Sequence, residues 1–187
     1  MTLYDKIAAF TPCNAQETAD HLLMLAQLRR YDDLLFRSNP VMHLTASGWV
    51  VDPSREHVLM VYHNIYQSWS WCGGHADGDA DLLAVALREV REETGAEHLR
   101  AISPEIFSLE ILGVKGHVRR AEYVSTHLHL NLTYLLEADF AQPLRVKTDE
   151  NSAVAWVPVS EVLARCSEPD MRPVYQKLMK KVRDSQK

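Results

Sequence analysis

The chain has 187 residues, a hydrophobic fraction of 47% and a formal net charge of −5 at pH 7. This length and composition suit one domain with a substantial core, and neither a Pro/Gly/Ser-rich linker nor an internal repeat divides the chain. The acidic balance argues against a general nucleic-acid binder, which carries a basic surface to neutralise phosphates. A small anionic substrate stays compatible with it, because a bound metal ion supplies local positive charge.

The cysteines and the N-terminus indicate the compartment. Cys13, Cys72 and Cys166 are widely scattered and have no metal-type spacing, which suits reduced thiols. The N-terminal segment carries an acidic residue early, and no run approaches the roughly 18 apolar residues of a membrane span. We therefore expect a cytoplasmic protein with no membrane partner.

The first predicted element is a helix over residues 14–30, where apolar residues recur at helical spacing and Asn14 is a candidate N-cap. We expect this helix to lie on the domain or on a second subunit, so a homodimer stays open. Residues 1–40 are accordingly assigned to an N-terminal helical extension, and residues 41–187 to the main domain.

The rest of the chain alternates strands and helices. Strands are predicted over residues 41–51 and 57–62, with a turn at residues 52–54. Further strands are predicted over 105–114, 123–137 and 154–157, followed by a short helix capped by Ser160 and a final helix over 171–183. Residues 115–120 form a basic turn that is interpreted as an exposed hairpin rather than as a phosphate contact.

Histidines recur along the predicted strand 123–137. The period-2 alternation places His127 and His129 on one face and Leu128 and Leu130 on the other. Two histidines at this spacing are compatible with metal binding, but with no third ligand nearby the pattern favours a pocket wall or a buried polar pair. His43, at the start of an earlier strand, is interpreted as a packed histidine rather than a ligand.

The most informative stretch is Gly73–Ala96, which reads GGHADGDADLLAVALREVREETGA. Its second half predicts an amphipathic helix, with Asp81 or Asp79 as the N-cap and Gly95 as the left-handed residue that ends it. The spacing of three glutamates puts them on one helical face beside the apolar face. These residues are Glu89, Glu92 and Glu93.

Three carboxylates on one turn repel one another, at a cost of a few tenths of a kcal/mol per pair. A cation between them would remove this repulsion. Ligand sets made only of oxygen favour hard divalent ions, and Mg²⁺ in particular is shared between carboxylates and substrate phosphates. The alternative is a solvated helix face, which is the usual context of a glutamate cluster.

The spacing of these residues resembles the Nudix box, which reads G, five residues, E, seven residues, R-E-U-x-E-E-x-G-U, with U an aliphatic residue. The six matching positions are Gly74, Arg88, Glu89, Glu92, Glu93 and Gly95. One position departs, because the first glutamate of the box falls on Ala80. This leaves the partner of Arg88 open between Asp79 and Asp81. The resemblance implies an α/β fold, a Nudix-like α/β/α sandwich with a mixed, curved sheet.

The resemblance further implies a pyrophosphohydrolase that depends on Mg²⁺ or Mn²⁺ and cleaves the diphosphate linkage of a nucleoside-diphosphate-linked or similar small molecule. Its metal ligands would be Glu89, Glu92 and Glu93 with the carbonyl of Gly73. Its further site residues would be Glu89 or Glu150 as general base and Arg88 orienting the glutamates. As substrate contacts we predict Trp69, in the lead-in to the box, and His127 and His129, from the alternation of their strand.

Two other functions remain open. The loss of the first box glutamate at Ala80 is compatible with a catalytically silent Nudix module that binds a nucleotide or regulates a partner. The pair Cys72 and His75 suggests an isopentenyl-diphosphate isomerase, since His75 coincides with a metal-ligand position of those enzymes. Aligned on the box, however, their cysteine falls on Gly73, one place after Cys72.

Overall fold

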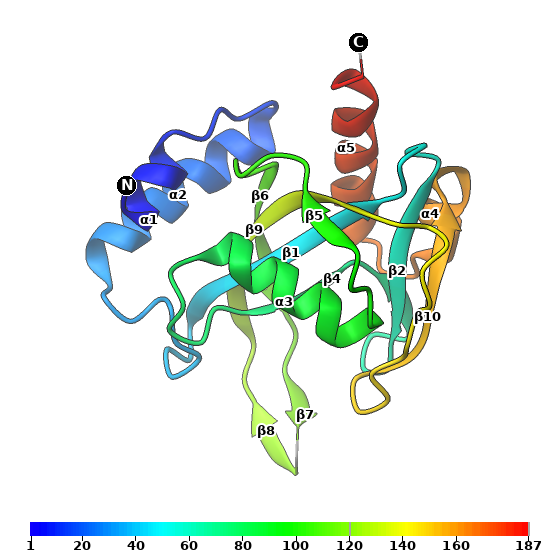
Figure 1. The fold of residues 1–187 in the computed structure, drawn as a ribbon. Helices are drawn as coiled ribbons and strands as arrows, with labels where there is room; N and C mark the ends of the chain where they lie inside the picture. The colour runs from blue at the N-terminus through cyan, green and yellow to red at the C-terminus, as the bar shows by residue number, and fades with distance from the viewer. Residues whose placement is uncertain (120, 187) are drawn as a thin grey trace.

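The computed structural model describes residues 1–119 and 121–186, and Figure 1 shows a curved sheet with helices on both sides. The helices are α1 (Leu3–Ala8), α2 (Ala15–Arg30), α3 (Leu82–Thr94), α4 (Val162–Arg165) and α5 (Met171–Asp184), with a 3-10 turn at Val159–Glu161. The strands are β1 (Met42–Val51), β2 (His57–His63), β3 (Ser68–Ser70), β4 (Cys72–His75), β5 (Leu99–Ala101), β6 (Ser108–Val114), β7 (His117–Arg119), β8 (Glu122–Val124), β9 (His127–Ala138) and β10 (Asn151–Pro158).

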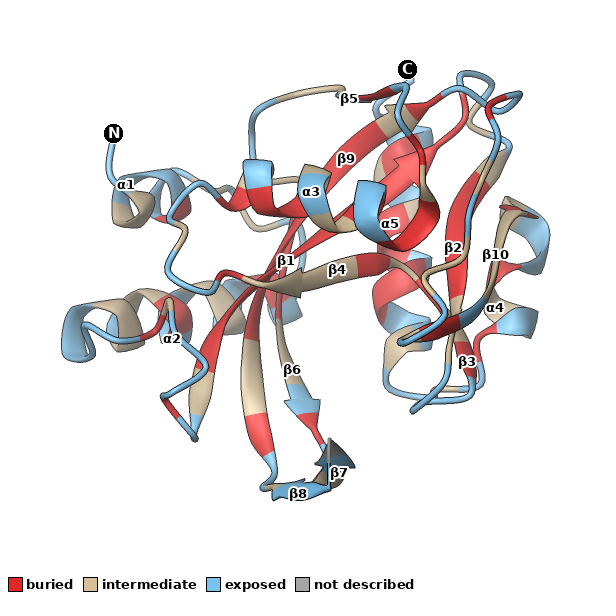
Figure 2. Ribbon diagram, turned by 60° about the horizontal axis from the view of Figure 1, so that its bottom comes forward, coloured by how far each residue is buried: buried red, intermediate tan, exposed pale blue. Residues whose placement is uncertain are grey.

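The sheet is built around β1 and β9, which run parallel from the pair Met42 and Leu128 to the pair Val51 and Glu137. Strands β2 and β4 pair antiparallel with β1, and β5 and β6 pair antiparallel with β9. Figure 2 shows β1 and β9 buried along most of their length. The sheet is therefore mixed, as predicted.

Each face of the sheet has its own hydrophobic core. One core joins α3, α1 and α2 to the sheet through residues such as Val90, Ile7 and Met24. The other joins α4 and α5 to the opposite face through Trp49 and Tyr175 among others. Two helical layers with a sheet between them make the predicted α/β/α sandwich.

Helix α3 follows the predicted boundaries closely. Its N-cap is Asp81, whose side chain accepts a hydrogen bond from the Ala84 N–H, and it ends at Gly95 with a left-handed φ of 70°. At Gly48 of β1 a Cβ atom would lie 2.6 Å from Val90 Cγ2. Only glycine lets the helix approach the strand this closely, which fixes α3 directly above β1.

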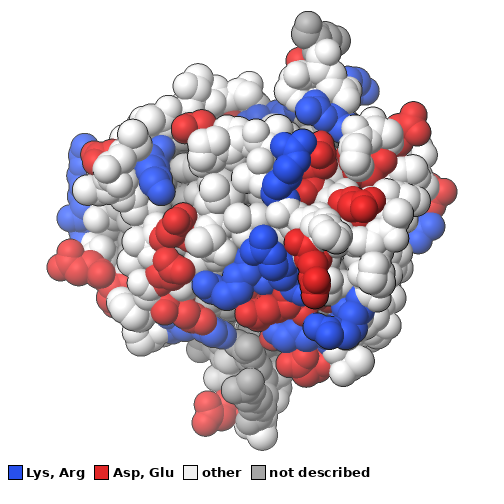
Figure 3. All heavy atoms as spheres, viewed as in Figure 1, with Lys and Arg blue, Asp and Glu red and all other residues white. Residues whose placement is uncertain are grey.

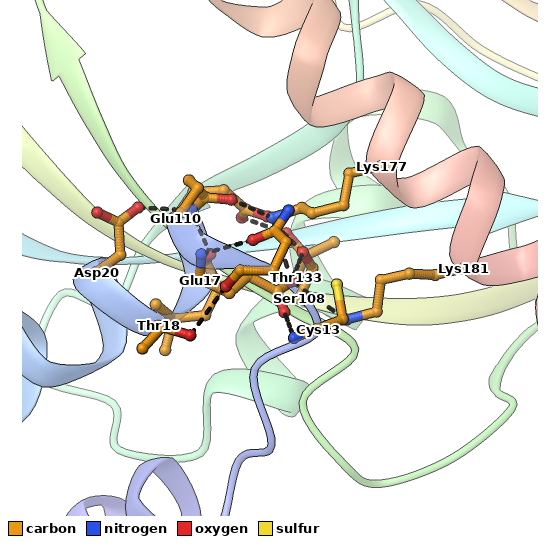
Figure 4. Close-up of polar contacts among 12 residues, drawn as sticks. Cys13, Glu17, Thr18, Asp20, Ser108, Glu110, Thr133, Lys177 and Lys181 are labelled. Carbon is orange, nitrogen blue, oxygen red and sulfur yellow. Dashed lines mark hydrogen bonds and ion pairs between the residues drawn. The ribbon is translucent and has the colours of Figure 1, made fainter.

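Helix α2 is anchored to the domain by a buried glutamate. Glu17 has no solvent exposure, and its Oε1 lies 3.1 Å from Lys181 Nζ and 3.2 Å from Lys177 Nζ, both on α5. Ser108 of β6 donates a hydrogen bond to the same carboxylate at 2.8 Å (Figure 4). The helix thus lies on the domain, as one of the two expected placements, while the division at residue 40 and a homodimer stay predictions.

The structure differs from the predicted elements in several places, and it adds α1, β3, β4 and β5, which were not predicted. The strand predicted over 105–114 begins at Ser108, and the strand predicted over 123–137 is split into β8 and β9. Between β6 and β9 the expected basic hairpin forms a small ribbon in which β7 pairs with β8. Arg120, at the end of the predicted basic turn, lies outside the described residues. Between the end of β8 and the start of β9, Thr126 Oγ1 accepts a hydrogen bond from the Gly116 N–H at 3.1 Å.

The predicted helix cap at Ser160 is wrong. Ser160 lies inside the 3-10 turn Val159–Glu161, whose N-cap is Pro158, and no side chain caps either that turn or α4. Ser160 lies two residues after the N-cap of the turn and one residue before Glu161, the N-cap of α4, so its hydroxyl is at neither capping position. Among the described helices, none combines the length and apolar character needed to cross a membrane.

Candidate active site

Two carboxylates of α3 lie against the backbone of two glycines in β4. The Gly73 N–H donates a hydrogen bond to Glu93 Oε1 at 2.8 Å, and Asn151 Nδ2 donates to Glu93 Oε2 at 3.0 Å. A Cβ atom on Gly74 would lie 2.5 Å from the carboxyl carbon of Glu89. Glycine is thus required at position 74 for Glu89 to lie where it does.

Burial and neighbouring acids raise the pKa values of two of these carboxylates, Glu93 and Glu89. Burial raises the pKa of Glu93 to about 8, although the hydrogen bonds from Gly73 and Asn151 oppose this shift and the charges of Glu89 and Glu150 add to it. Burial also raises the pKa of Glu89, and the neighbouring charge of Glu92 raises it further. At neutral pH, Glu93 therefore holds a proton unless a cation takes its place.

Lys147 connects the helix to the loop before β10. Its Nζ donates a hydrogen bond to Glu150 Oε2 at 2.9 Å and lies 3.9 Å from Glu92 Oε2. Burial would lower the pKa of Lys147, but the hydrogen bond to Glu150 and the surrounding acids raise it. This ammonium group links two of the predicted site residues that come from distant parts of the chain.

Arg88 has an acidic partner despite the alanine at position 80. Its Nη1 lies 3.4 Å from Asp79 Oδ2, and its Nη2 lies 4.0 Å from Glu89 Oε1. Asp79 Oδ1 also accepts a hydrogen bond from the Asp81 N–H at 2.9 Å. Of the two aspartates that flank Ala80, Asp79 therefore contacts Arg88, while Asp81 caps the helix.

A second polar cluster consists of four histidines, to which we refer as the histidine cluster: His43 of β1, His75 of β4, and His127 and His129 of β9. The ring of His43 lies 4.9 to 5.0 Å from each of the other three, measured between ring centroids. The interpretation that His127 and His129 have no third ligand nearby is therefore wrong. Three strands that are far apart in the sequence deliver these side chains to one place.

Burial keeps His43 and His129 uncharged. It lowers the pKa of His129 to about 2, an effect that the neighbouring His75 and His43 increase. The pKa of His43 is also lowered, chiefly by burial, against the hydrogen bond to Asn39. These two imidazoles are neutral at physiological pH, which is the form that binds metals.

The two clusters differ in how closely their ligand atoms approach. In the part of the chain that the structure describes, the one set of three His, Cys, Asp or Glu side chains with ligand atoms all within 4.8 Å of one another is His43, His75 and His129. Glu89, Glu92 and Glu93 are more widely spread, because Glu92 is half exposed beside Lys147 while Glu93 is buried.

Trp69 lies away from the carboxylates. Its ring packs edge-on against Tyr62 at 5.8 Å, the guanidinium of Arg165 lies 5.8 Å from the ring centre, and the side chain joins the core on the α4 and α5 side of the sheet. The described contacts do not connect Trp69 to Glu89 or Glu93. Its predicted role in substrate binding gains no support and stays a prediction.

Cys72 is unsuited to act as a nucleophile. The side chain is completely buried. Burial raises its pKa well above the ordinary value for a thiol, and the charges of Glu93 and Glu89 raise it further. Because the thiolate is the reactive form, this geometry gives no support to the isomerase interpretation.

Sequence reasoning from the motif missed Lys147 and Asn151. Both lie near Glu150 in the loop and strand that close over the end of α3, and both contact carboxylates of the helix. A basic residue three positions before Glu150 was the available signal, but a single lysine in a loop is ordinarily solvated. Figure 3 shows acidic and basic side chains interleaved on the face that carries α3.

The α/β/α sandwich and the glycine-supported carboxylates together are those of a Nudix-type hydrolase. The sequence matches the family model of the NUDIX domain over residues 41–178, and the chain belongs to that family. This confirms the predicted family and enzyme class. No curated protein shows significant sequence similarity to the chain.

Solved structures show the same fold at low sequence identity. An Ap4A hydrolase of C. elegans has a TM-score of 0.55 at 15% identity, over 75% of this chain and 95% of that one. The Nudix hydrolase RenU of M. smegmatis has a TM-score of 0.53 at 17% identity, over 74% and 84%. The NUDIX domain of Shewanella oneidensis NrtR, solved with ADP ribose, has a TM-score of 0.54 at 18% identity, over 87% and 97%.

Proposed function

We propose that this Nudix-type hydrolase uses Mg²⁺ or Mn²⁺ to cleave the diphosphate linkage of a nucleoside-diphosphate-linked or similar small molecule. The observation that carries the proposal is the pair of carboxylates, Glu89 and Glu93, held against the backbone of Gly73 and Gly74. The fold is shared with an Ap4A hydrolase and with a domain solved with ADP ribose, which supports a nucleotide-linked substrate. The net charge of −5 supports a small molecule rather than a nucleic-acid polymer.

The residues fit a hard divalent ion. The donors at the site are oxygens, from the carboxylates of Glu89, Glu92 and Glu93 and the carbonyl of Gly73, and such sets suit Mg²⁺ and Mn²⁺. The pKa of Glu93, raised to about 8 mainly by burial, indicates that this place lacks positive charge. The space that a Cβ on Gly74 would fill is the space in which the Glu89 carboxylate lies.

When bound, the ion supplies Lewis acidity, which polarises phosphoryl oxygens and lowers the pKa of a coordinated water. The chain's own residues position it and handle the proton. Glu150 accepts a hydrogen bond from Lys147, which positions its carboxylate. It is also partly exposed, so it is a candidate general base that water can reach. Glu89 is the other candidate, since its carboxylate lies beside the backbone of Gly74, next to Glu92 and Glu93 on the same helical face.

Arg88 acts on the geometry of the site rather than on the substrate. It lies between Asp79 and Glu89, within 4.0 Å of both carboxylates. A guanidinium in this place limits the rotation of the Glu89 side chain and partly offsets its charge. Position 80 needs no carboxylate for this role, because Asp79 supplies one.

The experiment that tests the proposal is a phosphate-release screen of diphosphate compounds, run with Mg²⁺, with Mn²⁺ and with a chelator. We expect hydrolysis of at least one nucleoside-diphosphate-linked compound that requires the metal and disappears in Glu93→Gln. The matched control is Glu97→Gln, an exposed residue just past the end of α3, which should retain activity. Metal-independent hydrolysis, or equal loss in both variants, would contradict the assignment.

The silent module is the second candidate, and Ala80 is the observation that favours it. Tight nucleotide binding by the wild-type chain without turnover of any compound in the same screen would establish it. The contact between Arg88 and Asp79 weighs against it, because the arginine keeps an acidic partner.

A further inference from the structure

The histidine cluster has features that carboxylate chemistry does not explain. In the parallel pairing of β1 and β9, His43 lies opposite His129. In the antiparallel pairing of β1 and β4, His75 lies opposite Thr45, two residues along from His43. The pairing of these strands thus places three imidazoles at neighbouring positions on one face of the sheet. One ring nitrogen from each lies within 4.8 Å of the other two.

The hydrogen bonds of His43 leave one nitrogen without a partner in a buried place. Its Nδ1 lies 3.2 Å from the carbonyl oxygen of Asn39, and since a carbonyl only accepts, Nδ1 carries the proton. Its Nε2 is buried and has no hydrogen-bond partner, in a residue that is only 5% exposed. A buried lone pair without a partner costs free energy, and a metal ion would satisfy it.

His127 fixes the proton on His129 in the same way. The Nδ1 of His127 lies 2.8 Å from the carbonyl oxygen of Ser125, so that nitrogen is the donor. Its Nε2 therefore accepts from His129 Nε2–H at 3.2 Å, which leaves Nδ1 of His129 unprotonated. Ligating histidines characteristically donate their second N–H to a backbone carbonyl or another acceptor, and both His43 and His129 are held in this way.

We propose that His43, His75 and His129 bind one Zn²⁺ ion, at a site separate from the carboxylates that we assign to Mg²⁺ or Mn²⁺. Imidazole nitrogens suit zinc and other borderline ions rather than Mg²⁺. Zn–N bonds of about 2.0–2.1 Å in tetrahedral geometry place the nitrogens roughly 3.4 Å apart. The observed separations, at most 4.8 Å, would therefore have to shorten by no more than about 1.4 Å when the ion binds.

Three histidines leave a fourth position for water or an anionic oxygen. His75 and His129 are half-buried whereas His43 is buried, so the cluster has a closed side and a side nearer to solvent. His75 also follows Gly73 and Gly74 directly in β4. A zinc ion here would therefore lie at one end of the same strand whose glycines support the carboxylates, where it adds positive charge for an anionic substrate.

The test measures zinc directly, and not activity. The full-length chain is stripped with a chelator, dialysed against excess Mg²⁺ to occupy the carboxylate site, and titrated with Zn²⁺ and with Co²⁺. We expect one equivalent of Zn²⁺ per chain to remain bound, and Co²⁺ to give the visible absorption of a nitrogen-ligated site. No zinc retained in excess Mg²⁺ would overturn the proposal and identify the cluster as a buried polar group.

Variants locate the site. His43→Gln and His129→Gln should each weaken Zn²⁺ binding at least about 100-fold, and His127→Gln, which removes only the acceptor for His129, about 10- to 100-fold. His98→Gln changes an exposed histidine and should bind as the wild type does. Glu93→Gln should also keep its zinc, which separates this site from the carboxylates. Equal binding by His129→Gln and His98→Gln would overturn the assignment.

A measurement on the wild-type chain covers the case in which a histidine variant does not fold. Zn²⁺ at constant Mg²⁺ should raise the thermal unfolding temperature, because it binds the folded state. It should also protect the half-buried His75 and His129, and not the exposed His98, from carbethoxylation as mapped by mass spectrometry. Unchanged modification of His75 and His129 with zinc present would contradict the proposal.

Discussion

Two buried glutamates in this protein have opposite pKa shifts. Glu17 of α2 is 0% exposed and Glu93 of α3 is 5% exposed. Burial alone would raise both pKa values, yet the pKa of Glu17 is lowered to about 2 while that of Glu93 is raised to about 8. The difference lies in what surrounds each carboxylate.

Glu17 has its charge matched within the chain. The Cys13 N–H, Lys177, Lys181 and Ser108 all contact it and outweigh the cost of burial. Glu93 has two neutral hydrogen-bond donors, and its nearest charged neighbours include Glu89 and Glu150, both acidic. A buried charge is stable only when it is paired. Glu17 therefore serves the fold, whereas Glu93 marks the place where a cation is needed.

The largest expected effect is the loss of stability when Glu17, the paired buried carboxylate, is replaced. Glu17→Gln should destabilise the protein by about 3 kcal/mol, the low end for breaking a buried pair, because Lys177 keeps its contact with Glu110. Urea unfolding at pH 7 measures the free energy of unfolding. A loss below about 1 kcal/mol, typical of an exposed pair, would show that Glu17 is not held as described.

The same variant has a pH dependence of known sign. The folded pKa of Glu17, about 2, lies below its ordinary value of 4.5, so its charge stabilises the folded state above pH 4.5. This contribution is lost as the pH falls from 4.5 towards 2. The difference in unfolding free energy between wild type and Glu17→Gln should therefore shrink over that range. A constant difference would contradict the assigned pKa.

Replacing the glutamates of the proposed metal site should lower activity rather than stability. Glu93→Gln and Glu92→Gln should each lower kcat/KM by at least about 100-fold, as expected for groups that stabilise transition-state charge. Steady-state rates with Mg²⁺ on the substrate found in the screen measure this loss. Full activity in either variant would remove that residue from the metal site.

The stability of Glu93→Gln sharpens the contrast with Glu17. The folded pKa of Glu93, about 8, lies above its ordinary 4.5, so its stabilising contribution, present below pH 4.5, falls as the pH rises to about 8. Glutamine avoids this loss. In the presence of a chelator at pH 8, the variant should unfold at the same or a higher temperature than wild type. A clear drop would mean that Glu93 serves the fold as Glu17 does.

A smaller loss is expected from the glycine that supports Glu89. The Cβ atom of Gly74→Ala would lie 2.5 Å from the Glu89 carboxyl carbon and displace it. Activity should fall about tenfold, since displacing a catalytic group by even about 1 Å is costly. Gly113→Ala, where a Cβ meets nothing within 4 Å, is the control. Equal activity of both variants would place Glu89 outside the reaction.

The smallest effect concerns Lys147, whose ammonium group lies near Glu92 and Glu150. Lys147→Met removes a positive charge that competes with the metal, so the Mg²⁺ concentration for half-maximal activity should fall about fivefold, or roughly 1 kcal/mol. A metal titration of the steady-state rate checks this. An increased Mg²⁺ requirement would show that Lys147 supports the metal site by positioning Glu150 instead.

The sequence predicted those parts of the protein that depend on local spacing. The limits of α3, the cap at Asp81 and the left-handed Gly95 follow from the order of residues within one helix. The strand β1 and the helix α2 are also close to their predicted ranges. By contrast, Ser160 was wrongly placed as a cap, because the 3-10 turn that displaces it depends on how the chain leaves β10.

The functional site likewise divides into a part that the sequence predicted and a part that only the tertiary structure revealed. The motif in Gly73–Ala96 identified the family and placed three glutamates on one helical face, which local geometry guarantees. Only the tertiary structure decided which carboxylates are buried, that Lys147 and Asn151 contact them, and that His43 and His75 lie beside His127 and His129. The physical reason is that a helix brings together residues three or four apart, whereas the pairing of β1, β4 and β9 brings together residues separated by up to 86 positions.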